Sequence, residues 1–257
     1  MQPVVVVGPG EIGRTFASGW LRLGYPVFPV IRGQSLADAA QAVESPALVL
    51  VSVGELELAA TLENLPMPWR DRVALVQNEL VPSIWEAHAI SPSVSIVWFE
   101  KRAGQAPRVL LPSVNFGPKE QLLGEALGAL SIASRPIYEQ SELSYELAKK
   151  NLYILTLNLA GLRTQGNAGH LLSLHHSLFR TVAKEVIQLQ SALMSQPLPE
   201  AQLIGDLESA ILADPEHGCL GRTARERLAR ALRNAQVHGL TLPTLESLGV
   251  EFLSAQP

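Results

Sequence analysis

The sequence has almost no cysteine: Cys219 is the only one in 257 residues. One cysteine cannot form an intrachain disulfide, so a disulfide-stabilised fold is excluded and a reducing compartment is expected. We interpret Cys219 as a structural thiol, and a role as a nucleophile is the alternative.

Long apolar runs and an excess of basic residues are also missing. No apolar stretch reaches the roughly 18 residues that a membrane-spanning helix needs. The valines at residues 4–7 end at Gly8 and have no basic residues before them, which predicts no secretory signal peptide. The formal net charge is −4, so there is no basic surplus for binding a phosphate backbone. We expect a cytoplasmic protein that binds neither membranes nor nucleic acid.

The histidines do not form a metal-binding pattern. His170, His175 and His176 fall on one stretch of expected helix, but adjacent helical residues diverge by about 100°. No carboxylate recurs nearby at metal-ligand spacing. The sequence therefore predicts no metal site, and it has no GxSxG motif for a serine nucleophile.

What the chain does have is a large apolar fraction and a regular alternation of elements. Residues are 47% hydrophobic, enough for a packed core. A strand at residues 4–7 is followed by a glycine turn and a helix at residues 12–23. Further elements are expected in the same alternating order: strands at 25–31, 47–53 and 72–77, and a helix at 57–65. This order predicts a parallel sheet covered on both faces, with residues 25–31 at an edge because they contain two prolines.

The pattern changes after residue 94. Short apolar runs are interpreted as strands added at one edge of the sheet: 94–99, 109–111 and 114–116. A helix at 119–130 and a last strand at 131–138 follow. Apolar residues at helical spacing then predict helices at 143–162, 171–194, 201–212 and 223–238. We expect an α/β protein with a parallel-sheet domain over residues 1–140 and an all-α domain over residues 141–257.

The loop Gly8-Pro9-Gly10-Glu11-Ile12-Gly13 joins the first strand to the first helix. In a Rossmann domain the first glycine permits a tight turn, the second lets backbone approach a pyrophosphate, and the third lets helix pack on strand. The context between strand and helix supports this interpretation, and the helix N-terminus favours an anion. The loop predicts a Rossmann-type domain that binds a dinucleotide, with an empty site on a retained fold as the alternative.

Arg32 follows the second expected strand. Proteins that prefer NAD usually have Asp or Glu there, to accept a hydrogen bond from the ribose 2′-OH. A guanidinium can instead pair with a 2′-phosphate. Arg32 therefore predicts NADP, and the alternative is a solvated loop charge.

Six motifs stand in order along most of the chain. They are the glycine loop, Arg32, Val76-Gln77-Asn78, Glu146-Leu147-Ala148-Lys149-Lys150, Asn158-Leu159-Ala160-Gly161-Leu162 and His238-Gly239-Leu240-Thr241-Leu242-Pro243. In this order and spacing the chain resembles the ketopantoate reductase (2-dehydropantoate 2-reductase) family, within the wider group of 6-phosphogluconate-dehydrogenase-like reductases.

The resemblance implies a lysine general acid on the first helix of the second domain, and an asparagine two turns later that helps hold the substrate. By position these are Lys150 and Asn158. An ammonium there could bind the keto oxygen and donate a proton as hydride arrives. The alternative is that Lys149 and Lys150 are both solvated. Cofactor contacts are also expected at Val53 and Asn78, where the third and fourth strands end.

The expected function is reduction of a small 2-keto acid or related carbonyl compound with NADPH, by a homodimer whose helical domain carries the substrate. The chain departs from the family pattern at three places. Gly54-Glu55 stands where the family has a lysine, Glu79 replaces a glycine, and Thr223 stands where the family has a glutamate. These departures support a second hypothesis, a catalytically degenerate NADP(H)-binding protein that acts as a sensor or interaction module.

Overall fold

The computed structural model describes residues 1–253 of the chain. The chain forms two compact units, Met1–Glu146 and Leu147–Pro257. The two units meet within helix α6 (Gln140–Thr164), after Glu146, whereas the sequence-based boundary was expected at residue 140, where this helix begins. The first turns of α6 belong to the first unit. Glu146, at the end of these turns, forms an ion pair at 2.6 Å with Arg135 of the first unit.

The first unit is built on a seven-stranded sheet with the order β2-β1-β3-β4-β5-β8-β9. The strands are β1 (Val4–Val7), β2 (Val27–Val30), β3 (Leu48–Val51), β4 (Val73–Leu75), β5 (Ser93–Ile96), β8 (Ser113–Phe116) and β9 (Ser134–Pro136). β1 to β5 are parallel, β8 is antiparallel to β5, and β9 is parallel to β8. The predicted α/β class with a mostly parallel sheet is confirmed, and the proline-containing strand β2 lies at the edge, as expected.

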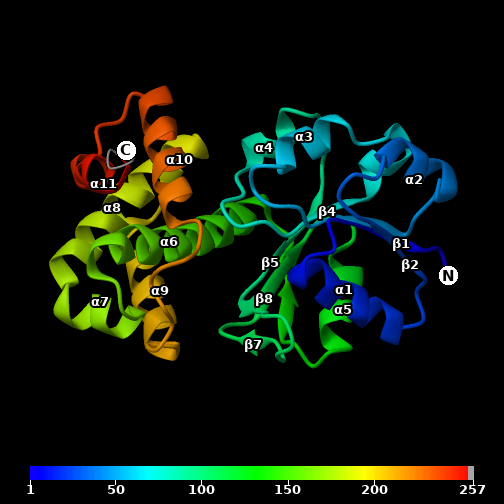
Figure 1. Cartoon of the computed structure of the whole chain (residues 1–257), viewed down its shortest axis with the longest axis horizontal. Helices are drawn as coiled ribbons and strands as arrows, with labels where there is room; N and C mark the ends of the chain where they lie inside the picture. The colour runs from blue at the N-terminus through cyan, green and yellow to red at the C-terminus, as the bar shows by residue number, and fades with distance from the viewer. Residues whose placement is uncertain (254–257) are drawn as a thin grey trace. The chain divides into compact units, whose positions relative to one another are not determined.

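Helices cover both faces of this sheet (Figure 1). α1 (Glu11–Arg22) and α5 (Glu120–Gly128) lie on one face, while α2 (Leu36–Ala42), α3 (Leu58–Glu63) and α4 (Pro82–Glu86) lie on the other. A 3-10 helix, Met67–Arg72, precedes β4. The helix predicted at 57–65 is α3, and α2 and α4 were not predicted.

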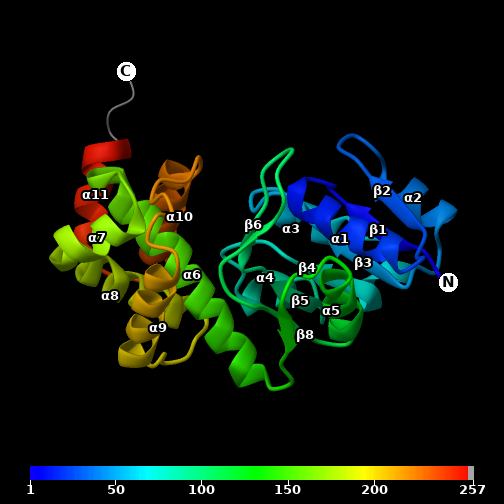
Figure 2. The same cartoon turned by 90° about the horizontal axis from the view of Figure 1, so that it is seen from below.

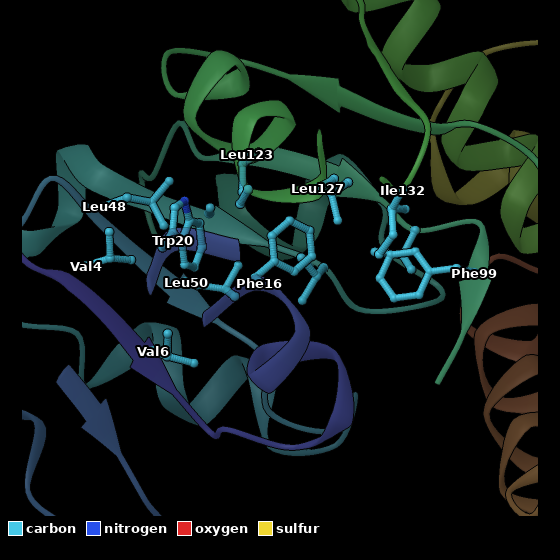
Figure 3. Packing of buried hydrophobic residues seen from close by; sticks show 14 residues of the cluster. Val4, Val6, Phe16, Trp20, Leu48, Leu50, Phe99, Leu123, Leu127 and Ile132 are labelled. Carbon is cyan, nitrogen blue, oxygen red and sulfur yellow. The ribbon is translucent and has the colours of Figure 1, made fainter. Parts of the chain in front are cut away.

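The core of the first unit lies between the sheet and the pair α1 and α5. Figure 3 shows Phe16 and Trp20 of α1 pointing toward Leu123 and Leu127 of α5, and all four are fully buried. Trp20 Nε1 donates to the carbonyl oxygen of Leu122 at 3.0 Å. This contact satisfies the indole N–H and holds α1, which follows the glycine loop, in a fixed place.

Two sequence-based expectations for the first unit are wrong. The run 94–99 is not one strand, because it is divided between β5 in the main sheet and a short strand that begins at Phe99 in another sheet. Residues 109–111 do not join the main sheet; β7 (Arg108–Val109) pairs with β6 (Phe99–Glu100) in a separate two-stranded sheet. The reason is the reversal of direction between β5 and β8. The residues between these strands leave the sheet, turn and return, and pair with each other.

The second unit is helical, as predicted (Figure 2). Besides α6 it contains α7 (Ala168–Leu174), α8 (His176–Leu193), α9 (Glu200–Ala213), α10 (Ala224–Val237) and α11 (Pro243–Leu253). The single helix predicted at 171–194 is wrong, because the chain breaks at His175 between α7 and α8. α11 was not predicted. Within the described residues, no helix is both long and apolar enough to cross a membrane.

Candidate functional site

The candidate site is a pocket of about 980 Å³ in the first unit. It is lined by Gly8 to Gly10 of the glycine loop, by the loop after β2 with the start of α2, and by the loop after β3 with α3. β2 and β3 lie on opposite sides of β1, so the strand order reverses at this point. In doubly wound sheets, ligands bind outside the carboxyl ends of the strands at such a reversal.

The three glycines of the loop have three different environments. Gly8 has φ +73°, and a Cβ there would lie 2.8 Å from Cγ1 of Val53. A Cβ on Gly13 would overlap the hydroxyl of Ser52 and lie 3.2 Å from Cγ1 of Val6. Gly10 is open, since its nearest neighbour would be the Gly8 carbonyl at 4.0 Å. Gly8 and Gly13 are therefore required for the fold of the loop itself. Gly10 is not required for the fold, and its missing side chain leaves space beside the backbone.

The N-terminus of α1 borders this space. Gly10 is the N-cap residue of the helix and has no side chain with which to cap it, so first-turn N–H groups remain for an anionic ligand. Gly8, Pro9 and Gly10 line the pocket, whereas Glu11, Ile12 and Gly13 form the first turn of α1 and are not among its lining residues.

Glu11, in this first turn, faces two cations. Its carboxylate lies 3.4 Å from Lys101 Nζ and 3.8 Å from a guanidinium nitrogen of Arg14. Arg14 also lines the pocket, and its Nε donates to the carbonyl oxygen of Pro9 at 2.8 Å. The charge of Glu11 is therefore compensated beside the place where an anion would bind.

Arg32 lines the pocket after β2, and its side chain is 87% exposed. It is paired: Nη2 lies 2.5 Å from Oε1 of Glu57. The other carboxylate oxygen of Glu57 accepts from the backbone N–H of Gly54 at 3.3 Å. Glu57 was missed as a site residue, because sequence alone does not show that the loop after β3 reaches the loop after β2.

Val53 lines the pocket, but Asn78 does not. Asn78 lies after β4, next to Gln77, whose side-chain Nε2 donates to the carbonyl oxygens of Val51 and Val53 at 2.8 and 3.2 Å. Glu79 has φ +58°. This is the left-handed region that favours glycine, so the backbone keeps a glycine-like conformation although the residue is glutamate.

In the second unit, Lys149 and Lys150 have different surroundings. Lys149 Nζ lies 3.8 Å from a carboxylate oxygen of Asp206 on α9. Lys150 Nζ lies 5.8 Å from the ring centroid of the buried Tyr153, one turn further along α6. Both lysines are half-buried, so neither is a fully solvated surface charge.

Asn158 is buried, and both ends of its amide are bonded within the second unit. Oδ1 accepts from Nη1 of Arg227 at 2.9 Å, and Nδ2 donates to the carbonyl oxygen of Cys219 at 3.3 Å. A Cβ on Gly221 would overlap Oδ1 of Asn158, so this amide is closely packed. Arg227 was missed, although Ala224, Leu228 and Ala231 place position 227 on the buried side of its helix.

Cys219 is fully buried, and burial raises the pKa of its thiol to about 11. The thiolate is the nucleophilic form of cysteine. A pKa this high therefore favours the structural interpretation of Cys219. Among the described residues, no group of three or more His, Cys, Asp or Glu could hold a metal ion.

The fold and the pocket define an α/β protein with a Rossmann-type N-terminal unit and a helical C-terminal unit. No family model matches the chain. No curated protein sequence matches it significantly.

The chain shares its fold with solved structures of ketopantoate reductases and of D-mandelate dehydrogenase. A complex of D-mandelate dehydrogenase with NADH superposes with a TM-score of 0.69 at 13% identity, covering 99% of this chain and 98% of that one. The probable 2-dehydropantoate 2-reductase of Bacillus subtilis has a TM-score of 0.68 at 16% identity, covering 99% and 100%. The dimeric ketopantoate reductase of Staphylococcus aureus has a TM-score of 0.68 at 13% identity, covering 98% of each chain. The resemblance found in the motifs thus extends to the fold.

Proposed function

We propose that the protein is an NADPH-dependent reductase of a small 2-keto acid or a related carbonyl compound, similar to ketopantoate reductase. The observation that carries this proposal is the pocket at the end of β1, where Gly10 leaves the backbone open beside the N-terminus of α1. Support comes from the shared fold, since the similar structures are named for reduction or oxidation of keto and hydroxy acids and one of them holds NADH.

The residues of the pocket fit a dinucleotide. The backbone from Gly8 to Gly10 and the first turn of α1 would hold the pyrophosphate. Arg32 would pair with the 2′-phosphate of the adenosine ribose, which favours NADPH over NADH. Val53 would contact the cofactor from the loop after β3, and Asn78 from the loop after β4. The bound nicotinamide supplies the hydride that reduces the carbonyl carbon.

Lys150 is the proposed proton donor. When hydride reaches the carbonyl carbon, negative charge develops on the oxygen, and an ammonium both stabilises that charge and donates the proton. This role requires Nζ to come within hydrogen-bond distance of the substrate oxygen. Asn158 is proposed to help hold the substrate, with Arg227 fixing the orientation of its amide.

The test is a spectrophotometric screen of NADPH oxidation against 2-keto acids, including ketopantoate, with purified protein. Reduction of at least one such compound, with the hydroxy acid as product, is the expected result. Tight binding of NADPH without reduction of any carbonyl compound would contradict the proposal.

A second candidate is a catalytically degenerate NADP(H)-binding protein that acts as a sensor or interaction module. The observation that favours it is the bonding of Asn158, whose amide is occupied at both ends by Arg227 and Cys219. If this candidate is correct, a dinucleotide still binds but the screen finds no substrate. The NADP(H)-bound and free forms should then differ in their affinity for another protein or in their oligomeric state.

We also propose that the protein forms a homodimer. The support is the dimeric ketopantoate reductase of Staphylococcus aureus, which shares the fold. Light scattering coupled to gel filtration measures the molar mass directly. A mass of one chain at micromolar concentration would contradict this part of the proposal.

A further inference from the structure

Glu57 brings a carboxylate into the proposed cofactor pocket from the segment after β3, although an acidic residue in such a pocket normally follows β2. It is the N-cap residue of α3 and lines the pocket together with Arg32. One of its oxygens lies 2.5 Å from the guanidinium of Arg32, and the other accepts from the N–H of Gly54. The carboxylate is therefore held from both sides, between the loop after β2 and the loop after β3.

The sheet order explains why these two loops meet. β2 and β3 both pair with β1, one on each side, and all three strands run in the same direction. Their carboxyl ends therefore lie together beside the glycine loop. In Rossmann domains that prefer NAD, the acidic residue that reads the ribose 2′-OH follows the second strand. In this chain that position holds Arg32. The acidic side chain of Glu57 reaches Arg32 from the segment after β3, on the other side of β1.

The pair gives the pocket one group suited to each form of the cofactor. A carboxylate accepts a hydrogen bond from a ribose 2′-OH, whereas a guanidinium pairs with a 2′-phosphate. The phosphate must compete with Glu57 for Arg32, and its charge has the same sign as that of Glu57. Because the two side chains are 87% and 48% exposed, solvent screens their pairing, and an exposed pair of this kind is weak enough for a phosphate to replace it.

We infer that Glu57 is a cofactor-selecting residue, and that the Arg32–Glu57 pair lets the pocket bind nicotinamide dinucleotides both with and without a 2′-phosphate. With NADH, Glu57 accepts from the 2′-OH while Arg32 remains paired. With NADPH, Arg32 turns to the phosphate and Glu57 opposes it. This inference rests on the proposed function, because it assumes that a nicotinamide dinucleotide is the ligand.

The test measures dissociation constants for NADPH and NADH by fluorescence titration, which does not depend on a substrate. Glu57→Gln removes the charge but keeps the shape of the side chain. It is expected to tighten NADPH binding and to weaken NADH binding, shifting the ratio of the two dissociation constants toward NADPH by about tenfold. Arg32→Ala is expected to shift the ratio about tenfold in the opposite direction.

The matched control is Glu63→Gln. Glu63 lies on the same helix, is exposed, and is not among the residues that line the pocket. Glu63→Gln removes a negative charge of the same size from the same helix. The ratio of the NADPH and NADH dissociation constants is therefore expected to change by less than twofold. Raising the salt concentration should reduce the effect of Glu57→Gln, because exposed charges are screened.

A ratio in Glu57→Gln that stays within twofold of the native ratio would overturn the inference. So would an equal shift in Glu63→Gln, which would mean a general effect of net charge. Glu57→Ser supplies a second variant, since serine is a good N-cap residue and also removes the charge. Failure of the native protein to bind either dinucleotide would instead contradict the proposed function.

Discussion

The two units of the molecule use their polar groups differently. In the first unit, the polar groups around the pocket are backbone N–H groups and exposed side chains, such as Arg32 and Glu57. In the second unit, the important polar side chains are buried and bonded to groups of the same unit. Asn158 joins Arg227 to Cys219, and Glu185 of α8 accepts from the N–H groups of Thr244 and Leu245 at 2.8 and 2.9 Å.

This difference indicates which groups are free to bind a ligand and which stabilise the fold. A buried polar group without a partner costs free energy, so helices that pack closely bring their polar side chains together in pairs. The carboxyl ends of parallel strands, in contrast, leave loops around a space that no side chain fills. Substitutions in the pocket should therefore change ligand binding, and substitutions in the helical unit should mainly change stability, with Lys150 as the proposed exception.

The largest effect is expected from Gly10→Val. A valine side chain would occupy the space proposed for the pyrophosphate and abolish NADPH binding. The fold should tolerate it, because Gly10 has φ −71° and ψ −167° and a Cβ there meets nothing closer than 4.0 Å. Isothermal titration calorimetry measures the binding, and thermal unfolding measures the stability.

Gly128→Val is the matched control for Gly10→Val. Gly128 is at the end of α5 in the same unit, and a Cβ there meets no atom within 4 Å. The Gly128→Val protein should bind NADPH with native affinity. If the folded Gly10→Val protein binds NADPH with native affinity, the phosphates bind elsewhere. The first unit would then not differ from the second in the way described above.

The next largest effect is expected from Lys150→Ala, once a substrate has been found. Loss of a general acid commonly costs about 10² to 10⁴ in rate, so kcat should fall at least 10²-fold while the dissociation constant of NADPH stays within a few fold. Steady-state kinetics and cofactor titration measure the two quantities.

Lys149→Ala is the control for this prediction, because Lys149 is the neighbouring lysine and pairs with Asp206. Its kcat should be close to native. Normal turnover by Lys150→Ala would make Lys150 a structural residue like its neighbours in the helical unit, and the proton donor would have to be sought elsewhere.

Glu185→Gln should destabilise the second unit without changing the pocket. The substitution removes the charge and one of the two acceptors that satisfy the N-terminus of α11, which should lower the free energy of unfolding by about 2 kcal/mol. Urea unfolding measures this value. Glu200→Gln, an exposed residue paired with Lys184, should change it by less than about 0.5 kcal/mol. A change in NADPH affinity in Glu185→Gln would contradict the separation of roles between the units.

The last effect concerns Cys219, and it is absent at neutral pH and appears only at high pH. Burial raises the pKa of this thiol from 9.0 to about 11, so the folded state retains the proton that the unfolded state loses. The native protein should therefore lose stability as the pH rises from about 9 to about 11, by roughly 2 kcal/mol relative to Cys219→Ala. Urea unfolding of both proteins over this pH range measures the difference. Parallel curves would show that the thiol titrates normally.

Much of the fold could be predicted because it depends on local patterns. The valines of β1, the glycine loop and the apolar spacing of α1 are adjacent in the chain, so strand, turn and helix follow from neighbouring residues. The same holds for the helical second half. One error lies where longer-range pairing decides: residues 109–111 lack a place in the main sheet because the chain reverses direction there. Another is the break at His175, which divides the helix predicted at 171–194.

The glycine loop of the candidate site was visible in the sequence for the same reason. Its fingerprint is six residues long, and each glycine has a steric reason of its own. Arg32 was also identified, because its distance from the loop is set by one helix and one strand. Val53 and Asn78 depended on the family resemblance, and only Val53 lines the pocket.

Sequence by itself therefore determined the order of most elements, the Rossmann-type loop and the absence of an intrachain disulfide. Only the tertiary structure brought Glu57 to Arg32 and Arg227 to Asn158, because each pair joins residues that are far apart in the chain. The first pair forms because β2 and β3 flank the same strand, and the second because the folding of the helical unit brings Arg227 of α10 within hydrogen-bond distance of Asn158 on α6. The sequence shows that a charged or polar side chain needs a partner or water. Which partner it has depends on how whole helices and strands pack together.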